Sequence, residues 1–177
     1  MNPETIPLAE KLATLLSDYV TAKFLAHGYH WNVQGKDFKE FHAFFEDLYT
    51  DFDSAIDPVA ENLRKLGFEA PYQLADFQAN ATIQEDLIVG GDIETMVASL
   101  IRINQALLDD SFASFAAASD VNQQGIANFL AERIDKHQFW NWQLTATLKV
   151  STDIAATAPD MAPDMSDYMP DDSSEEL

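Results

Sequence analysis

The 177-residue chain contains no cysteine, which excludes a disulfide framework, a zinc–thiolate site and a thiol nucleophile. Basic residues are also scarce, since ten Lys and Arg stand against 30 Asp and Glu and give a net charge of −20. Residues 151–177 contain no Lys or Arg at all. A chain this acidic repels phosphate backbones and attracts cations, so we expect no nucleic-acid partner.

Several further patterns are missing. No segment approaches about 18 consecutive apolar residues, and no basic region followed by an apolar run opens the chain, so neither membrane spanning nor secretion is supported. A cytoplasmic location is the default expectation. No Gly-rich phosphate loop and no Ser/His/Asp arrangement supports a transferase or hydrolase. Glu-x-x-His, the motif of metal centres built inside a single helical bundle, is absent too.

The periodicity of apolar residues predicts an all-α protein. Apolar side chains recur at three- and four-residue steps in four long stretches, 4–33, 38–66, 93–118 and 122–150. Gly67 is suited to end the second helix and Asp92 to cap the third. A short helix is expected near 73–78. We therefore predict a four-helix bundle over residues 1–150, followed by an acidic tail, 151–177, that is expected to be disordered because it lacks a periodic apolar face.

Three of the four histidines lie between residues 27 and 42, just before a ladder of carboxylates. His42 and Glu46 are one helical turn apart, and so are Asp57 and Glu61. Fifteen residues of helix place Asp57 about 22 Å from His42, so one metal ion cannot reach both pairs. If the pairs act together, the second must come from another copy related by a two-fold axis. His30 can fold back over the Gly35 turn and complete a shell suited to iron, with zinc or manganese as substitutes.

The spacing of these residues resembles that of the Dps family of mini-ferritins. The matching elements are His30-Trp31-Asn32-Val33, a Gly two residues later, His42, and Asp57-x-x-Ala60-Glu61. The resemblance covers about residues 8–150. It implies a ferritin-like four-helix bundle with a short helix in the connection between the second and third long helices, assembled into a hollow shell of twelve subunits. It also implies ferroxidase centres with His30, His42 and Glu46 from one subunit and Asp57 and Glu61 from its partner.

The same resemblance implies that Fe(II) is bound, oxidised by hydrogen peroxide or O₂, and stored as ferric mineral, which protects against oxidative damage. Two alternatives remain open. Some family members coat DNA, but they carry a basic tail, whereas Lys11 is the only basic residue before position 20 here. The other alternative is a structural shell with a weakened metal site.

Two departures from the family pattern keep that last alternative open. Pro58 follows Asp57 directly, and a proline inside a helix removes one N–H and clashes with the carbonyl four residues earlier. We expect a local distortion of a helix that continues beyond Pro58. A second interpretation makes Asp57 the cap of a restarted helix. Asn62 stands where the family commonly has Arg, which removes a partner for the carboxylates.

Other polar or aromatic residues have simpler interpretations. His27 and His137 are each expected to be ordinary core or surface histidines. Asp53 is expected to face solvent or a pore, and Asp120 is a candidate for an acidic pore near the start of the fourth long helix. Trp31 directly follows His30, and both a role beside the metal and interface packing are open for it.

Overall fold

The computed structural model describes residues 2–85 and 92–148, and all regular structure in these ranges is helical. The elements are a 3-10 turn, η1 (Pro3–Thr5), and the helices α1 (Ile6–Asn32), α2 (Phe38–Lys65), α3 (Leu74–Asn80), α4 (Ile93–Asp120) and α5 (Gln124–Thr147). The predicted four long helices and the short fifth are confirmed. The expected disorder of 151–177 falls outside the described residues.

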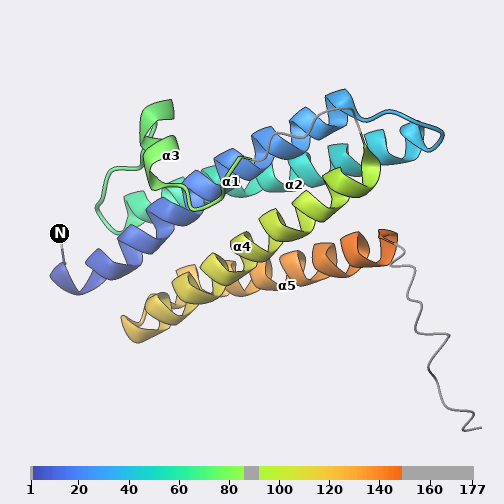
Figure 1. Ribbon diagram of the computed structural model, residues 1–177. Helices are drawn as coiled ribbons and strands as arrows, with labels where there is room; N and C mark the ends of the chain where they lie inside the picture. Colours follow the sequence, from blue (N-terminus) through green and yellow to red (C-terminus); the bar gives the residue numbers. More distant parts are fainter. Residues whose placement is uncertain (1, 86–91, 149–177) are drawn as a thin grey trace, which may run out of the picture.

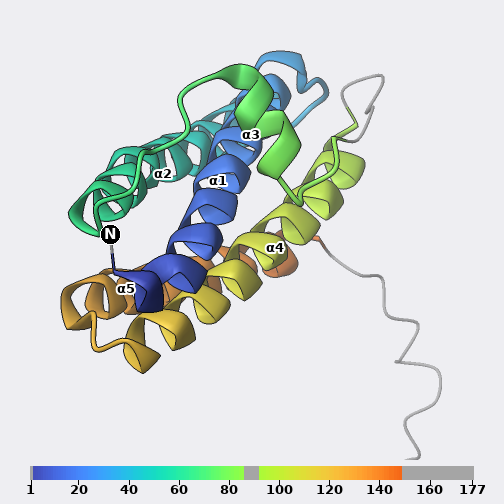
Figure 2. The same ribbon diagram turned by 90° about the vertical axis from the view of Figure 1, so that its left-hand side faces the viewer.

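The long helices form an antiparallel bundle with one long crossover. α1 and α5 run in one direction and α2 and α4 in the other (Figure 1). The described part of the crossover from α2 to α4, up to residue 85, contains α3, which lies across α1 (Figure 2). One long connection of this kind is typical of ferritin-like bundles. No helix among the described residues is both long and apolar enough to cross a membrane.

The ends of the helices follow local chemistry. Gly67 has φ of +87°, and the amide of Phe68 donates to the carbonyl of Leu63 at 3.1 Å, which is the Schellman motif expected at this glycine. Asp92 caps α4 by accepting from the amide of Thr95 at 3.0 Å. Asn122 ends α4 with φ of +58°. α5 consequently begins at Gln124 rather than at the predicted residue 122.

α2 passes through Pro58 without ending. The helix extends from Phe38 to Lys65 with Pro58 inside it, so its predicted continuation is confirmed and the interpretation of Asp57 as the cap of a restarted helix is wrong. Ser54, whose carbonyl would meet the proline ring, donates its hydroxyl to the carbonyl of Asp51 at 2.6 Å. Asp57 and Glu61 therefore stay one turn apart on a single helix.

The core lies between the four long helices. Burying each large apolar side chain contributes about 1.5–3 kcal/mol, and the chain buries many of them. The largest that are fully buried include Leu12, Leu15, Leu16, Tyr19, Phe45, Leu48, Phe52, Leu63, Met96, Leu100 and Leu107. α3 contributes no buried residue. This packed core holds the four long helices together, and these helices position the polar clusters described below.

Candidate metal centre

The turn between α1 and α2 brings His30 and His42 face to face. Their imidazole rings stack with centroids 3.6 Å apart and planes inclined by 22°. Nδ1 of His30 bonds to the carbonyl oxygen of His42 at 2.7 Å, and Nδ1 of His42 bonds to the carbonyl oxygen of His30 at 2.8 Å. This reciprocal pair fixes both rings to backbone at the end of α1 and the start of α2. The predicted approach of the two histidines is confirmed.

The paired hydrogen bonds also decide which nitrogen of each ring is available. A carbonyl oxygen can only accept, so Nδ1 must carry the hydrogen in both His30 and His42. In a neutral imidazole the lone pair then lies on Nε2, and a backbone carbonyl on the other ring nitrogen is the usual support of a metal-binding histidine. Neither Nε2 has a hydrogen-bond partner among residues 2–85 and 92–148. His30 and His42 therefore each present an oriented Nε2 lone pair that is available to bind a metal ion.

Glu46 lies one turn beyond His42 on α2 and is exposed. The hydroxyl of Tyr49 donates to its Oε1 at 3.4 Å. Partial burial, together with the nearby carboxylate of Glu46, raises the pKa of Tyr49. The Tyr49 ring also meets His30 edge-on, with centroids 5.3 Å apart. Sequence reasoning did not single out Tyr49, although its place three residues after Glu46 puts it on the same helical face.

Asp57 and Glu61 are not brought to this cluster. Both lie further along α2, where they are exposed to solvent, and helix geometry keeps Asp57 about 22 Å from His42. Within the described part of one chain, no group of three or more His, Asp or Glu side chains could hold a metal ion. One copy thus presents two separate candidate half-sites, one with imidazoles at the α1–α2 turn and one with carboxylates further along α2.

The interior of the bundle contains a different polar cluster, which we call the interior network (Tyr19, Asp51, Asn104, Arg133, His137 and Trp140). Asp51 accepts from the two terminal nitrogens of Arg133, at 2.7 and 3.2 Å, and from Nε1 of Trp140 at 2.9 Å. Burial alone would raise the pKa of Asp51, but the hydrogen bonds and charge of Arg133 outweigh it and the pKa lies below its usual value. The pair joins α2 to α5 in the middle of both helices.

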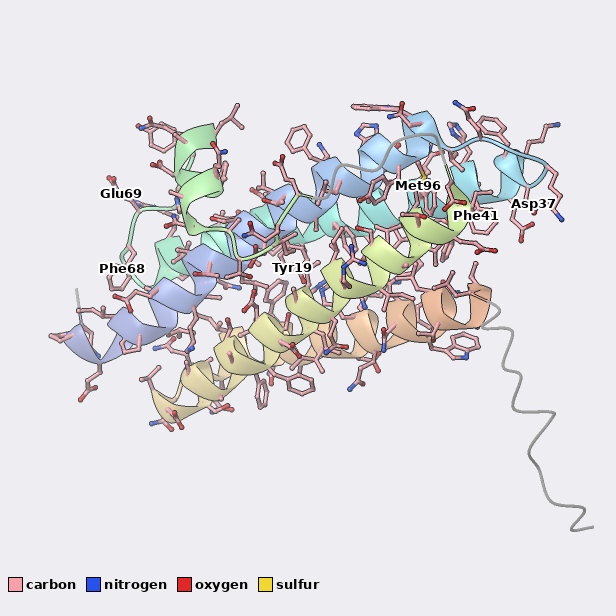
Figure 3. The ribbon with its side chains drawn as sticks, viewed as in Figure 1. Tyr19, Asp37, Phe41, Phe68, Glu69 and Met96 are labelled. Atoms are coloured by element: carbon pink, nitrogen blue, oxygen red, sulfur yellow. The ribbon has the colours of Figure 1, made fainter. Side chains whose placement is uncertain are left out.

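The network continues through Tyr19, which Figure 3 shows between the helices. Its hydroxyl accepts from Nε of Arg133 at 3.0 Å and donates to Nε2 of His137 at 2.6 Å. The other imidazole nitrogen donates to Asn104 at 2.8 Å, and Asn104 donates back to the carbonyl of His137 at 2.9 Å. Burial lowers the pKa of His137 to about 3. Of the two expected places, core or surface, His137 lies in the core, and both of its ring nitrogens are hydrogen-bonded.

Sequence reasoning missed the interior network, although a signal was present. Leu130, Arg133, His137, Trp140 and Leu144 follow one another at three- and four-residue steps, so Arg133 stands in the apolar stripe of its helix. Asp51 similarly lies between Leu48 and Ala55 on the stripe of α2. Charged residues of opposite sign within two facing apolar stripes indicate a buried ion pair.

The other singled-out residues lie as follows. His27 is half-buried between the rings of Trp31 and Tyr49, with centroids 4.2 and 4.1 Å away, and its Nδ1 is buried with no hydrogen-bond partner among the described residues. This differs from the satisfied core or surface histidine that we expected. Desolvation, followed by the charge of Lys23, lowers the pKa of His27.

Trp31 is 61% exposed in the single chain. Asp53 is exposed as predicted, 3.6 Å from the Lys23 ammonium.

Comparison with known proteins identifies the fold and family. A family model described as a ferritin-like domain matches residues 9–152. DNA protection during starvation protein 1 of Deinococcus radiodurans is 30% identical over 145 residues, which cover 80% of this chain and 66% of that protein. The chain belongs to the ferritin-like family, among the Dps proteins.

Solved structures agree with this assignment. The Dps protein of Vibrio cholerae, described as a member of a superfamily of ferritin-like diiron-carboxylate proteins, superposes with a TM-score of 0.79 at 29% identity, covering 82% of this chain and 91% of its own. A Dps protein from Bacillus brevis gives a TM-score of 0.80 at 26% identity, with coverage of 84% and 99%. The ferritin-like fold that the sequence predicted, including the short helix in the crossover, is confirmed for this Dps chain.

Proposed function

We propose that this protein is an iron-storing mini-ferritin with ferroxidase activity. Each site would take His30, His42 and Glu46 from one copy and Asp57 and Glu61 from a second copy, in a closed shell of about twelve subunits. Fe(II) is the substrate, and hydrogen peroxide or O₂ the oxidant. The observation that carries the proposal is the reciprocal His30–His42 pair, which orients the Nε2 atoms of a buried and a half-buried imidazole at the α1–α2 turn, one helical turn from the exposed Glu46.

The chemistry of the donor set suits this reaction. Imidazole nitrogen and carboxylate oxygen are both ligands for Fe(II), and the anionic oxygens favour the higher charge of Fe(III). Two Fe(II) ions lose two electrons in total, and one hydrogen peroxide accepts them with two protons to give two water molecules. The backbone bonds at His30 and His42 hold the rings still during this change, which reduces the reorganisation that the site must undergo.

The interior network supports an inter-subunit rather than an intra-bundle centre. A centre inside the bundle needs free ligands on the facing helices, but Asp51 and His137 are already bonded to Arg133, Trp140, Tyr19 and Asn104. Pro58 leaves α2 continuous, which keeps Asp57 and Glu61 on one helix as the proposed site requires. No observation favours the DNA-coating alternative. With a net charge of −20, the protein should leave duplex DNA unshifted in a gel at about 150 mM salt.

Iron oxidation by matched variants tests the proposal. Fe(II) is added without oxygen, one hydrogen peroxide is supplied per two Fe(II), and the ferric product is followed by absorbance. His42→Ala and Asp57→Asn should each slow oxidation at least about tenfold. Asp53→Asn removes a carboxylate from the same helix, one turn before Asp57, and should react like the wild type. Equal rates in the Asp57 and Asp53 variants would contradict the assignment.

A further inference from the structure

Asp18 on α1 and Asp110 on α4 form a pair of acidic residues that belongs to neither candidate half-site. Asp18 is fully buried, and its carboxylate holds the crossover segment. Oδ1 accepts from the amides of Thr82 and Ile83 at 2.7 and 2.9 Å, and Oδ2 accepts from the hydroxyl of Thr82 at 2.8 Å. Three hydrogen-bond donors thus converge on Asp18, and its carboxylate holds Thr82 and Ile83 against α1. We call residues 74–83, which comprise α3 and these donors, the α3 segment.

The carboxyl group of Asp110 contacts that of Asp18, and its Oδ2 is buried with no donor among the described residues. Two carboxylates cannot bond to each other unless one carries a proton. The three donors keep Asp18 an acceptor, so the proton belongs on Asp110. Burial, the contact with Asp18 and the charge of Asp109 raise the pKa of Asp110 to about 7, against the opposing charge of Lys11.

We infer that the Asp18–Asp110 pair is a proton-dependent anchor of the crossover, holding the α3 segment firmly when the pair shares a proton and loosely when both carboxyl groups are ionised. Few apolar contacts hold the segment besides this anchor: α3 has no fully buried residue and exposes 74% of Leu74, while Phe77 packs partly buried against the core and Ile83 is buried in it. The charged groups that act on Asp110 are Asp18 and Lys11 from α1 and Asp109 from α4. Thr82 and Ile83, which donate from the crossover, are uncharged.

The direction of the pH effect follows from the raised pKa. Between about pH 4 and 7 the unfolded carboxyl group has lost its proton while the folded one retains it. The contribution of Asp110 to stability is therefore complete at the acid end of this range and is lost as the pH rises through about 7. Above that value two negative charges meet in a poorly solvated space, and the hydrogen bonds to Thr82 and Ile83 should open more often.

Amide hydrogen exchange on the intact protein tests the inference without iron. Protection factors of Thr82 and Ile83, corrected for the intrinsic effect of pH, should fall about tenfold between pH 5.5 and 8.5. Asp110→Asn keeps a donor beside Asp18 and should remain protected at both pH values. Asp109→Asn removes an exposed charge that contributes less than Asp18 to the raised pKa of Asp110, so the fall in protection should persist with a somewhat lower midpoint.

Two results would overturn the inference. One is constant protection of these amides in the wild type across this range, and the other is an equal loss of pH dependence in Asp109→Asn. Should Asp110→Asn fail to fold, a carbon NMR titration of the wild-type Asp110 carboxyl decides the matter. A midpoint near pH 7 supports the shared proton, whereas a midpoint near 4 contradicts it. Failure of iron oxidation would leave these readouts unaffected.

Discussion

The interior network and the His30–His42 pair use the same kinds of side chain but differ in what they leave unbonded. Inside the bundle, His137 has a partner on both ring nitrogens, and Asp51 accepts three hydrogen bonds. At the α1–α2 turn, His30 and His42 each use one nitrogen for structure and leave the other available. Residue type alone therefore does not distinguish the candidate site from the interior network, whereas the unused ring nitrogen on His30 and His42 does.

The largest effect should come from breaking the interior ion pair. Arg133→Met leaves the largely buried Asp51 carboxylate, 12% exposed, without its cation, which should cost about 3 kcal/mol of unfolding free energy. Urea unfolding at a fixed subunit concentration measures this loss. Lys23→Met breaks the more exposed pair with Asp53 and should cost less than about 1 kcal/mol. Comparable losses in the two variants would mean that the interior network does not hold the bundle together.

Removing the buried imidazole should have the next largest effect. His137→Leu leaves the Tyr19 hydroxyl without its acceptor and the Asn104 side-chain oxygen without its donor, which should cost about 2 kcal/mol at pH 8. Because the folded pKa is about 3, the wild type should lose stability as the pH falls below about 6.5, where the unfolded imidazole takes up a proton. The variant should lack this loss. Asp110 acts in the opposite direction in both proteins, so the difference between their pH profiles isolates His137.

The two clusters also differ in how far the sequence predicts them. The approach of His30 and His42 follows from a short turn between two periodic helices, so local reasoning is sufficient. The meeting of Tyr19, Asp51 and Arg133 depends on how three helices pack, which spacing along the chain does not specify. Likewise, no local pattern places Asp110 beside Asp18. The late start of α5 depends on the left-handed backbone of Asn122, which an Asn permits but does not require.

A smaller effect on stability is expected at the candidate half-site formed by His30, His42 and Glu46. His42→Gln removes a ring that is stacked on His30 and bonded to its carbonyl, which should cost about 1 kcal/mol. Fe(II) binding measured by anaerobic titration should nevertheless weaken at least about tenfold. This contrast distinguishes a binding site from a structural cluster. A stability loss as large as that of Arg133→Met would mean that His42 mainly stabilises the bundle rather than binding Fe(II).

The smallest effect should be that of Asp57→Asn on stability. The side chain is exposed and makes no hydrogen bond among the described residues, so the unfolding free energy should change by less than about 0.5 kcal/mol. Thermal melts at one subunit concentration provide the measurement. A clear loss of stability would show that Asp57 has a structural partner in the assembled protein other than iron.

The central claim, that each site draws on two copies, is tested most directly by co-expressing two inactive variants. When His42→Ala and Asp57→Ala subunits pair at random, half of the pairs are mixed, and each mixed pair has one intact site out of two. Purified mixed particles should therefore recover about a quarter of wild-type iron oxidation. Co-expressed His30→Ala and His42→Ala subunits damage every site and should recover none. Recovery in neither mixture, from particles of normal size, would place all the ligands within one subunit and contradict the account.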